Sequence, residues 1–483
     1  MPKTDINEFQ RPYDQVFIWA LVIFLLNLTL KGLFLEYPDF GHDEPFTLFR
    51  VQKTYSELIA DLAANNHPPL FESIMWVWLR ITGYSPTLLR IVPLLLSSAT
   101  AVALFWFGRK HFSLFVGVFS ALLFTFSDYH FYLSHEIRSY PLFAFLTVLS
   151  FDIYLRLSDK SIENKESDSK RKSKILLAAL IITNTLLLYT HYFSATIIAA
   201  QFLHALFIFR NRNLIFKVIA SLVSVSILYL PQIISVKSRL IDKVEGGHWL
   251  AAPGFEELFN VLRKFFNAPA IVILALALIL VSFWLTRKSQ FFKKQLAIGL
   301  LFPGVYIGMW VLAQETPVFQ DRYISFTTIG AFILCAITFE QLPKLTRLPS
   351  SIILLGIMAL LVNYKPSNKQ WVPELVEIIE SEKTENTTVY IYPSWSLQCF
   401  SYHYNLEFFK DYQKTRSLLA NENIILGNKK SVGDFISKSK ETEKFIIINF
   451  EGPISELAKD YGHLNPKVIE KDRHGVMVVK RNK

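Results

Sequence analysis

Apolar runs of roughly twenty residues recur along most of this chain, and they restrict the folds open to it. A helix of that length crosses the ~30 Å hydrocarbon core of a bilayer. Candidate spans lie near residues 16–35, 87–107, 112–131, 139–157, 175–191, 193–209, 214–234, 268–286, 296–313, 322–341 and 350–364. Hydrophobic residues make up 52% of the chain, against roughly 45–50% in soluble domains. The sequence therefore predicts a polytopic α-helical membrane protein with about 11 transmembrane helices.

Residues 70–83 form a shorter apolar stretch that carries Glu72 and Arg80. The stretch falls short of the ~20 residues needed to cross a bilayer. We expect an interfacial helix here, because Trp76 and Trp78 are typical of the membrane–water boundary.

The net charge of +10 comes from Lys and Arg clusters between the apolar runs, which indicates membrane orientation rather than nucleic-acid binding. With 70–83 excluded as a span, most of these clusters share one side, which the positive-inside rule makes cytoplasmic. The outer loops are then 36–86, 132–138, 235–267 and 314–321. The loop 235–267 is itself basic, and we expect a helix in it to lie against anionic headgroups.

The chain changes character after residue 364, where apolar runs shorten and charge rises. Residues 389–392 and 445–450 are typical of buried strands, and 373–380 is typical of a helix. We therefore predict two regions, a transmembrane catalytic domain over 1–364 and an extracytoplasmic α/β domain over 365–483. The two cysteines, Cys335 and Cys399, support neither a disulfide framework nor a cysteine metal site.

An acidic pair, Asp43-Glu44, follows the first apolar run. Alone, such a pair is more often an ordinary solvated turn, since Pro38, Gly41 and Pro45 surround it. Ionisable residues close to a membrane also mark functional sites. We interpret Asp43 as a catalytic base because of the pattern downstream.

Other outer segments place charged and aromatic residues at the ends of spans. His67 precedes Pro68-Pro69-Leu70 in the first loop. The other such residues are Glu136, Arg138 and Tyr140 at the second outer loop and Arg322 with Tyr323 at the last outer loop. Arg322 and Tyr323 alone are equally typical of a snorkelling anchor. Together on one face, these groups suit an anionic headgroup and a hydroxylated substrate.

In this ordered set the chain resembles the GT-C membrane glycosyltransferases, in particular the protein O-mannosyltransferases of glycosyltransferase family 39 and the bacterial lipid A aminoarabinose transferases. The matching features, in order, are the acidic pair after the first span, His-Pro-Pro-Leu at 67–70, Leu-Leu-Arg-Ile-Val-Pro at 88–93, Gly-Arg-Lys at 108–110, Glu-x-Arg-x-Tyr at 136–140, Arg-Tyr at 322–323 and a soluble tail. The resemblance implies a multi-pass enzyme of the bacterial inner or plasma membrane. It would transfer a hexose or pentose from a polyprenyl-phosphate donor to a hydroxyl of a lipid, glycan or protein at the outer face.

The resemblance also implies roles for the individual residues. Because a polyprenyl phosphate leaves readily, such an enzyme needs one base and cations for the phosphate, rather than the paired carboxylates of a glycoside hydrolase. Asp43 would be that base with Glu44 in support, and a single displacement would invert the anomeric carbon. Glu136 would line the sugar or acceptor pocket. Arg138 and Arg322 would hold the phosphate with Tyr140 and Tyr323 nearby.

No cofactor is required by this scheme, although a divalent metal ion is an open alternative. The chain has His67 where the lipid A transferases carry an acidic or basic residue before Pro-Pro-Leu. His67 and His248 with an acid are a candidate metal set, but two distant histidines more often bind no metal. His191, between two apolar runs, is more typical of a hydrogen-bonded helix end than of a catalyst.

Two other classes of protein fit a polytopic chain with acidic outer loops. A secondary transporter usually has midplane sites on broken helices in repeated halves, which this sequence lacks. A non-catalytic assembly subunit for glycans or lipids would tolerate the loss of Asp43. The sequence does not name the sugar, the acceptor or the oligomeric state.

Overall fold

The structure is a computed structural model that describes residues 13–36, 40–41, 43–65, 67–162, 167–245, 251–316, 318–365, 372–439, 444–450, 452–471 and 474–480. The chain forms two compact units. Met1–Leu35 with Ile59–Pro366 is called here the membrane unit, and Glu36–Leu58 with Ser367–Lys483 the C-terminal unit. The first predicted region, 1–364, includes residues 36–58, whereas their packing groups them with the second. The catalytic role and outer location predicted for the two regions stay predictions.

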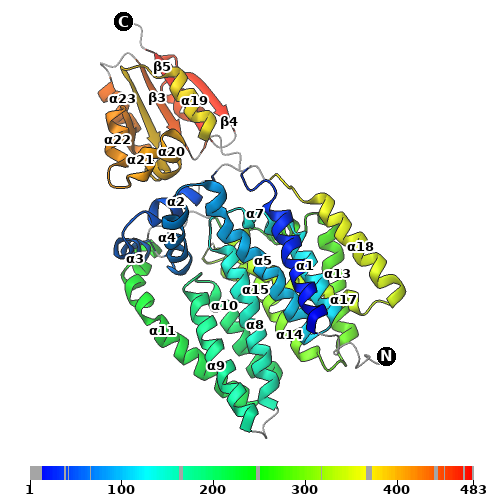
Figure 1. Cartoon of the computed structure of the whole chain (residues 1–483). Helices are drawn as coiled ribbons and strands as arrows, with labels where there is room; N and C mark the ends of the chain where they lie inside the picture. The colour runs from blue at the N-terminus through cyan, green and yellow to red at the C-terminus, as the bar shows by residue number, and fades with distance from the viewer. Residues whose placement is uncertain are drawn as a thin grey trace. The chain divides into compact units, whose positions relative to one another are not determined.

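The membrane unit is built from helices (Figure 1). The first half contains α1 (Tyr13–Gly32), α3 (Tyr55–Ala64, shared with the C-terminal unit), α4 (Leu70–Thr82), α5 (Pro86–His111), α6 (Leu114–Thr125), α7 (Asp128–Ser134), α8 (Tyr140–Ile162), α9 (Ser167–Leu188), α10 (Ser194–Leu203) and the π-helix η2 (His204–Phe209). The second half contains α11 (Arg212–Glu245), α12 (Phe255–Phe265), α13 (Pro269–Thr286), α14 (Phe292–Gly299), the π-helix η3 (Leu300–Gly304), α15 (Val305–Leu312), α16 (Asp321–Ile324), η4 (Ser325–Thr327), α17 (Thr328–Glu340) and α18 (Lys344–Leu361).

By length and composition, 8 helical segments of the described chain are able to cross a membrane, or 9 if the bent pair α6 and α7 counts as one. Each of the 8 lies over one of the predicted runs. The other three predicted runs are not among these 8 segments. Run 112–131 is broken by a 67° bend between α6 and α7. Run 175–191 lies mostly in α9, which begins among basic residues, and run 193–209 is a short helix that continues as a π-helix. The polytopic helical class is confirmed, and the number 11 stays a prediction.

Helix α4 has 13 residues, so it is too short to span and is not among those segments. Its face with Phe71, Glu72, Met75 and Leu79 is buried. On its other side the Arg80 guanidinium carbon lies 3.6 Å from the Trp76 ring centre. This two-sided character agrees with an interfacial helix, whose place at the membrane surface stays a prediction.

Close helix packing positions the rest of the unit. Helices α5 and α6 meet at Gly108 and Gly117, where a Cβ on Gly108 would lie 2.6 Å from the Gly117 Cα. Only glycine permits such contact, as in other membrane helix pairs. The segment from Asp321 to Glu340, which ends with α17, is the most buried of the candidate spans. It therefore fixes the Arg322–Tyr323 segment at one end of the bundle.

The C-terminal unit contains a five-stranded sheet in the order β2-β1-β3-β5-β4. The strands are β1 (Thr387–Tyr392), β2 (Ile424–Leu426), β3 (Lys444–Asn449), β4 (Lys467–Lys471) and β5 (His474–Lys480). Strands β2, β1 and β3 are parallel, while β5 runs antiparallel to both β3 and β4. The predicted strands 389–392 and 445–450 coincide with β1 and β3.

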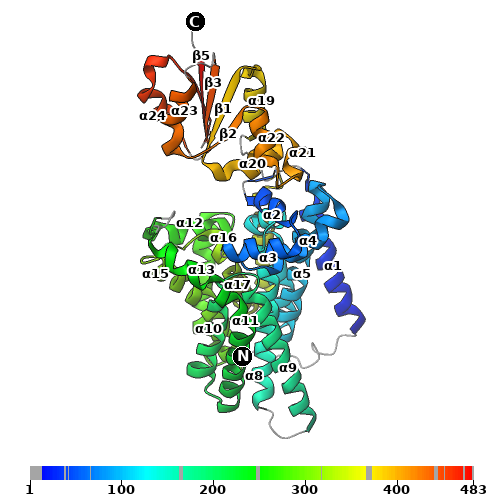
Figure 2. The same ribbon diagram turned by 90° about the vertical axis from the view of Figure 1, so that its left-hand side faces the viewer.

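Helices cover both faces of this sheet (Figure 2). One side carries α19 (Val372–Glu382), α20 (Leu397–Tyr404), α21 (Leu406–Lys410) and α22 (Thr415–Asn421), and the other carries α23 (Val432–Lys438) and α24 (Ser455–Asp460). Burial on both faces explains why residues 389–392 of β1 and 445–448 of β3 form unbroken runs of apolar and aromatic residues rather than alternating with polar ones. The N-terminal contribution to this unit is helix α2 (Asp43–Val51), which packs on α20.

Candidate functional site

Three turns of the membrane unit meet at His191, which lies in the turn between α9 and α10. Its ring stacks on Phe143 of α8 at 4.9 Å and 8°. It also lies 6.1 Å from the ring of Tyr140 and 5.6 Å from the ring of Tyr323. His191 thus brings together two of the predicted site segments, 136–140 and 322–323, as an aromatic bridge that was not among the predicted site residues.

Both predicted arginines belong to this cluster. Burial and, to a smaller extent, the nearby Arg138 guanidinium lower the pKa of His191 to about 3, so His191 is neutral at neutral pH. Arg322 donates from Nε to Gln320 Oε1 at 3.0 Å, and its guanidinium carbon lies 5.5 Å from the Tyr323 ring centre. The structure therefore gathers two forked cations and two tyrosines around a neutral histidine.

Glu136 lies at the edge of the same cluster and is only 7% exposed. Its carboxylate accepts a hydrogen bond from the Tyr132 hydroxyl. Tyr129 lies within electrostatic range of Glu136, Tyr140 and Asp321. The carboxylate is thus placed among phenols close to the arginine-bearing segment.

Helix α12 is tied to this end of the unit as well. Lys264 Nζ lies 2.5 Å from Asp321 Oδ2, directly before Arg322. Tyr306 donates to the Leu258 carbonyl at 2.7 Å. Lys264 is thus ion-paired to the site segment, and the placement of this helix against anionic headgroups stays a prediction.

His67 lies close to the same turn. Its carbonyl accepts from Gln232 Nε2 at 3.5 Å, and the Leu70 amide three residues later donates to the Tyr189 carbonyl at 2.9 Å. Glu72, buried in the first turn of α4, lies near Tyr192; burial raises the pKa of the Tyr192 phenol, and the Glu72 carboxylate raises it further. Glu72 is a second group that sequence reasoning missed, because an acid in a first helical turn also serves the helix dipole.

Two cations of the same end were also missed. Lys31, in the last turn of α1, is fully buried and donates to Ser97 Oγ at 3.1 Å and the His130 carbonyl at 3.3 Å. Arg90 is fully buried and donates to the Leu35 carbonyl at 3.1 Å. In the sequence, Lys31 and Arg90 each lie near the end of an apolar run, where a basic residue is typical of a snorkelling anchor.

No group of three His, Cys, Asp or Glu side chains able to hold a metal occurs in the part of the chain that the structure describes. His248 lies outside the described residues. The His67–His248 metal set stays a prediction, and the described residues around His67 do not supply a ligand set for it.

Asp43 and Glu44 begin helix α2 of the C-terminal unit. Glu44 is fully buried, and its Oε2 accepts from the Gly41 amide at 2.9 Å, as a helix-capping carboxylate does. Asp43 is only partly buried. Burial raises the pKa of the neighbouring Cys399 thiol, and the carboxylates of Glu44 and Asp43 raise it further. Glu44 therefore holds the start of the helix, which leaves Asp43 as the more accessible carboxylate.

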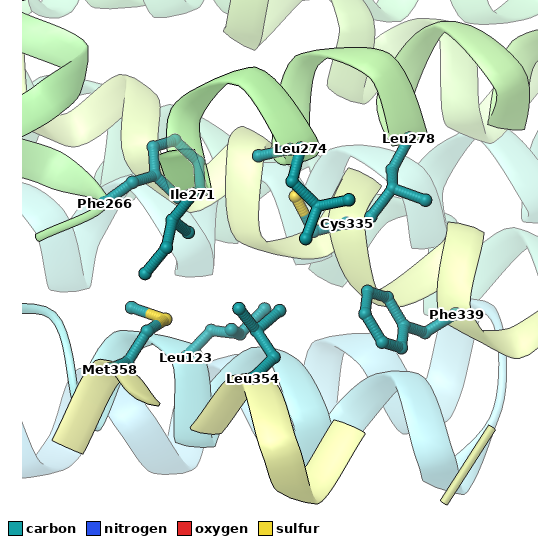
Figure 3. Close-up of a pocket in the computed structure, with 10 residues that line it drawn as sticks. Leu123, Phe266, Ile271, Leu274, Leu278, Cys335, Phe339, Leu354 and Met358 are labelled. Carbon is teal, nitrogen blue, oxygen red and sulfur yellow. The ribbon is translucent and has the colours of Figure 1, made fainter. Parts of the chain in front are cut away.

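A cavity of about 10 Å³ lies between α6, α13, α17 and α18 (Figure 3). Its lining is entirely apolar, with Leu123, Phe266, Cys335, Phe339 and Met358 among the residues shown. Such a space is at the lower limit for one water molecule and offers that water no polar partner. The cavity is part of the helix packing and not of the polar cluster.

Comparison with solved structures identifies the fold. The chain is similar to ArnT from Cupriavidus metallidurans in the apo state, with a TM-score of 0.64, 12% identity, and 96% of this chain and 98% of that chain covered. For ArnT bound to undecaprenyl phosphate the TM-score is 0.61 at 12% identity, with 96% and 97% covered.

For an oligosaccharyltransferase from Archaeoglobus fulgidus, in a complex with Zn and sulfate, the TM-score is 0.58 at 13% identity, with 89% of this chain and 67% of that chain covered. No protein-family model matches the chain. No curated protein matches it either. The chain has the GT-C fold, and the resemblance to GT-C membrane glycosyltransferases is confirmed at the level of fold.

Proposed function

We propose that this protein is an integral-membrane glycosyltransferase that moves a sugar from a polyprenyl-phosphate donor to an acceptor hydroxyl at the outer face of the membrane. The observation that carries the proposal is the likeness over 96% of the chain to a transferase whose structure holds undecaprenyl phosphate. The cluster of Arg138, Arg322, Tyr140 and Tyr323 around His191 supports it, because such a cluster suits a lipid-linked phosphate.

The reaction is a single displacement at the anomeric carbon. The acceptor oxygen attacks that carbon opposite the phosphate, and the bond from the carbon to the phosphate oxygen breaks. The electron pair of that bond leaves on the polyprenyl phosphate, and the acceptor proton passes to Asp43. One displacement inverts the configuration of the sugar.

Arg138 and Arg322 hold the phosphate, since planar guanidinium groups bind its oxygens in pairs. Their charge stabilises the leaving group as negative charge develops on it. Tyr140 and Tyr323, whose rings both lie beside His191, donate their hydroxyls to the phosphate. His191 keeps the two turns together and, being neutral, does not compete with the arginines for the phosphate.

Glu136 and Glu44 have supporting parts. Glu136, fixed by the Tyr132 hydroxyl, accepts from hydroxyls of the sugar or the acceptor. Glu44, fixed by the Gly41 amide, secures the first turn of α2 that bears Asp43. No step in this scheme passes through a metal ion.

Purified full-length protein in nanodiscs tests the proposal directly. It is incubated with a panel of polyprenyl-phosphate sugars and with lipid, glycan and peptide acceptors, and released polyprenyl phosphate is measured. We expect release with at least one donor and acceptor pair, with the sugar recovered on the acceptor in inverted configuration. Binding of donors without any release or transfer would contradict the proposed enzyme and favour a transporter or an assembly subunit.

A further inference from the structure

The segment that bears Asp43 belongs to one unit by chain connection and to the other by packing. Residues 36–58 are joined at both ends to the membrane unit, through Leu35 and Ile59. Their contacts nevertheless group them with Ser367–Lys483. Three points of attachment within the C-terminal unit account for this grouping.

The first attachment precedes the acidic pair. The ring of Phe40 lies 4.7 Å from the ring of Tyr402 in α20. His403 donates from Nε2 to the Phe40 carbonyl at 3.4 Å. Phe40 is only 2% exposed, so the chain is fixed three residues before Asp43.

The second attachment follows the acidic pair and centres on Phe409. Gln52 donates from Nε2 to the Phe409 carbonyl at 3.0 Å, and the Phe49 ring lies 5.6 Å from the Phe409 ring. Tyr402 meets the same ring edge-on at 5.3 Å. Phe409 is fully buried and therefore links the first attachment to the second.

The third attachment is at the start of α3. Tyr412 donates its hydroxyl to Glu57 Oε2 at 2.8 Å, and Lys53 Nζ lies 5.9 Å from the Tyr412 ring centre. Glu57 also caps α3 by accepting from the Thr54 amide at 3.0 Å. Helix α2 is thus held on both sides by residues of α20, α21 and the loop that follows.

Helix α2 needs this support, because it has 9 residues and isolated helices shorter than about 12–15 residues are marginal in water. Six of its residues are buried. We propose that the C-terminal unit is a positioning element of the transferase, which holds α2 through Tyr402, Phe409 and Tyr412 so that Asp43 is kept in its reactive place. This inference rests on the proposed function. Phe409 is its central positioning residue.

Phe409→Ala tests the inference, with Phe435→Ala as the matched control. Phe435 is a buried Phe of α23 in the same unit, and it packs on Tyr390 at 4.7 Å. Helix α23 lies on the other side of the sheet from α20 (Figure 2). Two quantities are measured on the full-length protein, hydrogen exchange of amides 43–51 against those of β3, and the kcat and donor KM of sugar transfer.

We expect Phe409→Ala to speed exchange in α2 by about tenfold or more while β3 changes little. We expect kcat to fall by about 10- to 100-fold, since small misplacements of a reacting group have effects of that size, with donor KM nearly constant. Phe409→Leu should recover most of the exchange protection of α2 and most of kcat. Phe435→Ala should instead affect β3 at least as strongly as α2.

Equal acceleration of α2 and β3 in Phe409→Ala would overturn the inference. So would an unchanged kcat in a protein whose α2 has been released. Loss of transfer in the wild-type protein would contradict the proposed enzyme but not the attachment of α2, which the exchange pattern decides separately.

Discussion

The ring of His191 lies 5.6 Å from the ring of Tyr323, so two turns far apart in the chain share one aromatic contact. The same histidine stacks on Phe143 at the start of α8. Arg138 lies close enough to His191 to lower its pKa, after the larger effect of burial. The proposed phosphate site therefore depends on a residue that need not touch the phosphate.

His191 is predicted to act through packing rather than proton transfer. With its pKa lowered to about 3, it carries no charge between pH 5 and 8. We expect His191→Phe to retain at least about a third of the wild-type kcat, while His191→Ala loses about tenfold, or ~1.4 kcal/mol of transition-state stabilisation. Steady-state kinetics of the two variants measure this. Equal inactivation of both variants would indicate a chemical role for the imidazole.

Arg138→Ala and Arg322→Ala are predicted to weaken the grip on the donor phosphate. We expect donor KM to rise about tenfold or more, or turnover to be lost, and Lys to rescue poorly because it cannot bind two oxygens in a plane. Arg347→Ala is the matched control, since Arg347 is paired with Glu340 at 2.8 Å outside the cluster. Wild-type KM in Arg138→Ala would remove Arg138 from the site.

The length and hydropathy of the apolar runs are sufficient to predict the helical membrane class from the sequence. They also predict that charged residues lie in the turns at the ends of the spans. The bend between α6 and α7 was not predicted. Next to it the Asn27 amide of α1 donates to Thr125 Oγ1 at 3.0 Å, a contact between distant residues that no local pattern encodes. Similarly, the attachment of α2 depends on Phe49 meeting Phe409, and no local pattern encodes that pairing. Glu72 and His191 were missed because their local signals also fit ordinary helix ends.

Glu382 predicts a pH dependence for the C-terminal unit. Hydrogen bonds from Lys444 at 2.6 Å and Lys467 at 2.8 Å lower the pKa of this carboxyl to about 2. A pKa depressed by folding contributes stability above the unfolded value of about 4.3, and that stability is lost as pH falls toward 2. We expect Glu382→Gln to lower the free energy of unfolding at pH 7 by about 1 kcal/mol or less, because Lys467 is largely exposed.

Thermal unfolding of wild type and Glu382→Gln across pH 2–7 measures this contribution. The difference between the two proteins should be constant above about pH 5 and vanish near pH 2. A difference that grows on acidification would have the wrong sign for a depressed carboxyl pKa.

The predicted orientation is testable at the turn after α4. Both native cysteines are buried, so a new thiol at residue 84 can be read against a low background. We expect Tyr84→Cys to react with a membrane-impermeant maleimide added outside intact cells. Lys288→Cys, after α13 on the predicted cytoplasmic side, should react only after permeabilisation. The reverse pattern would overturn the orientation and with it the outer location of the C-terminal unit.

Asp43→Asn gives the most direct test of the proposed mechanism, with donor binding and sugar transfer measured on the same preparation. The change is nearly isosteric and removes only the ability to take a proton. We predict that polyprenyl-phosphate sugar binds with wild-type Kd while transfer falls by at least about 10²-fold, the usual cost of losing a general base. Near wild-type transfer by Asp43→Asn would contradict the mechanism, and loss of donor binding together with transfer would assign Asp43 to binding instead of proton removal.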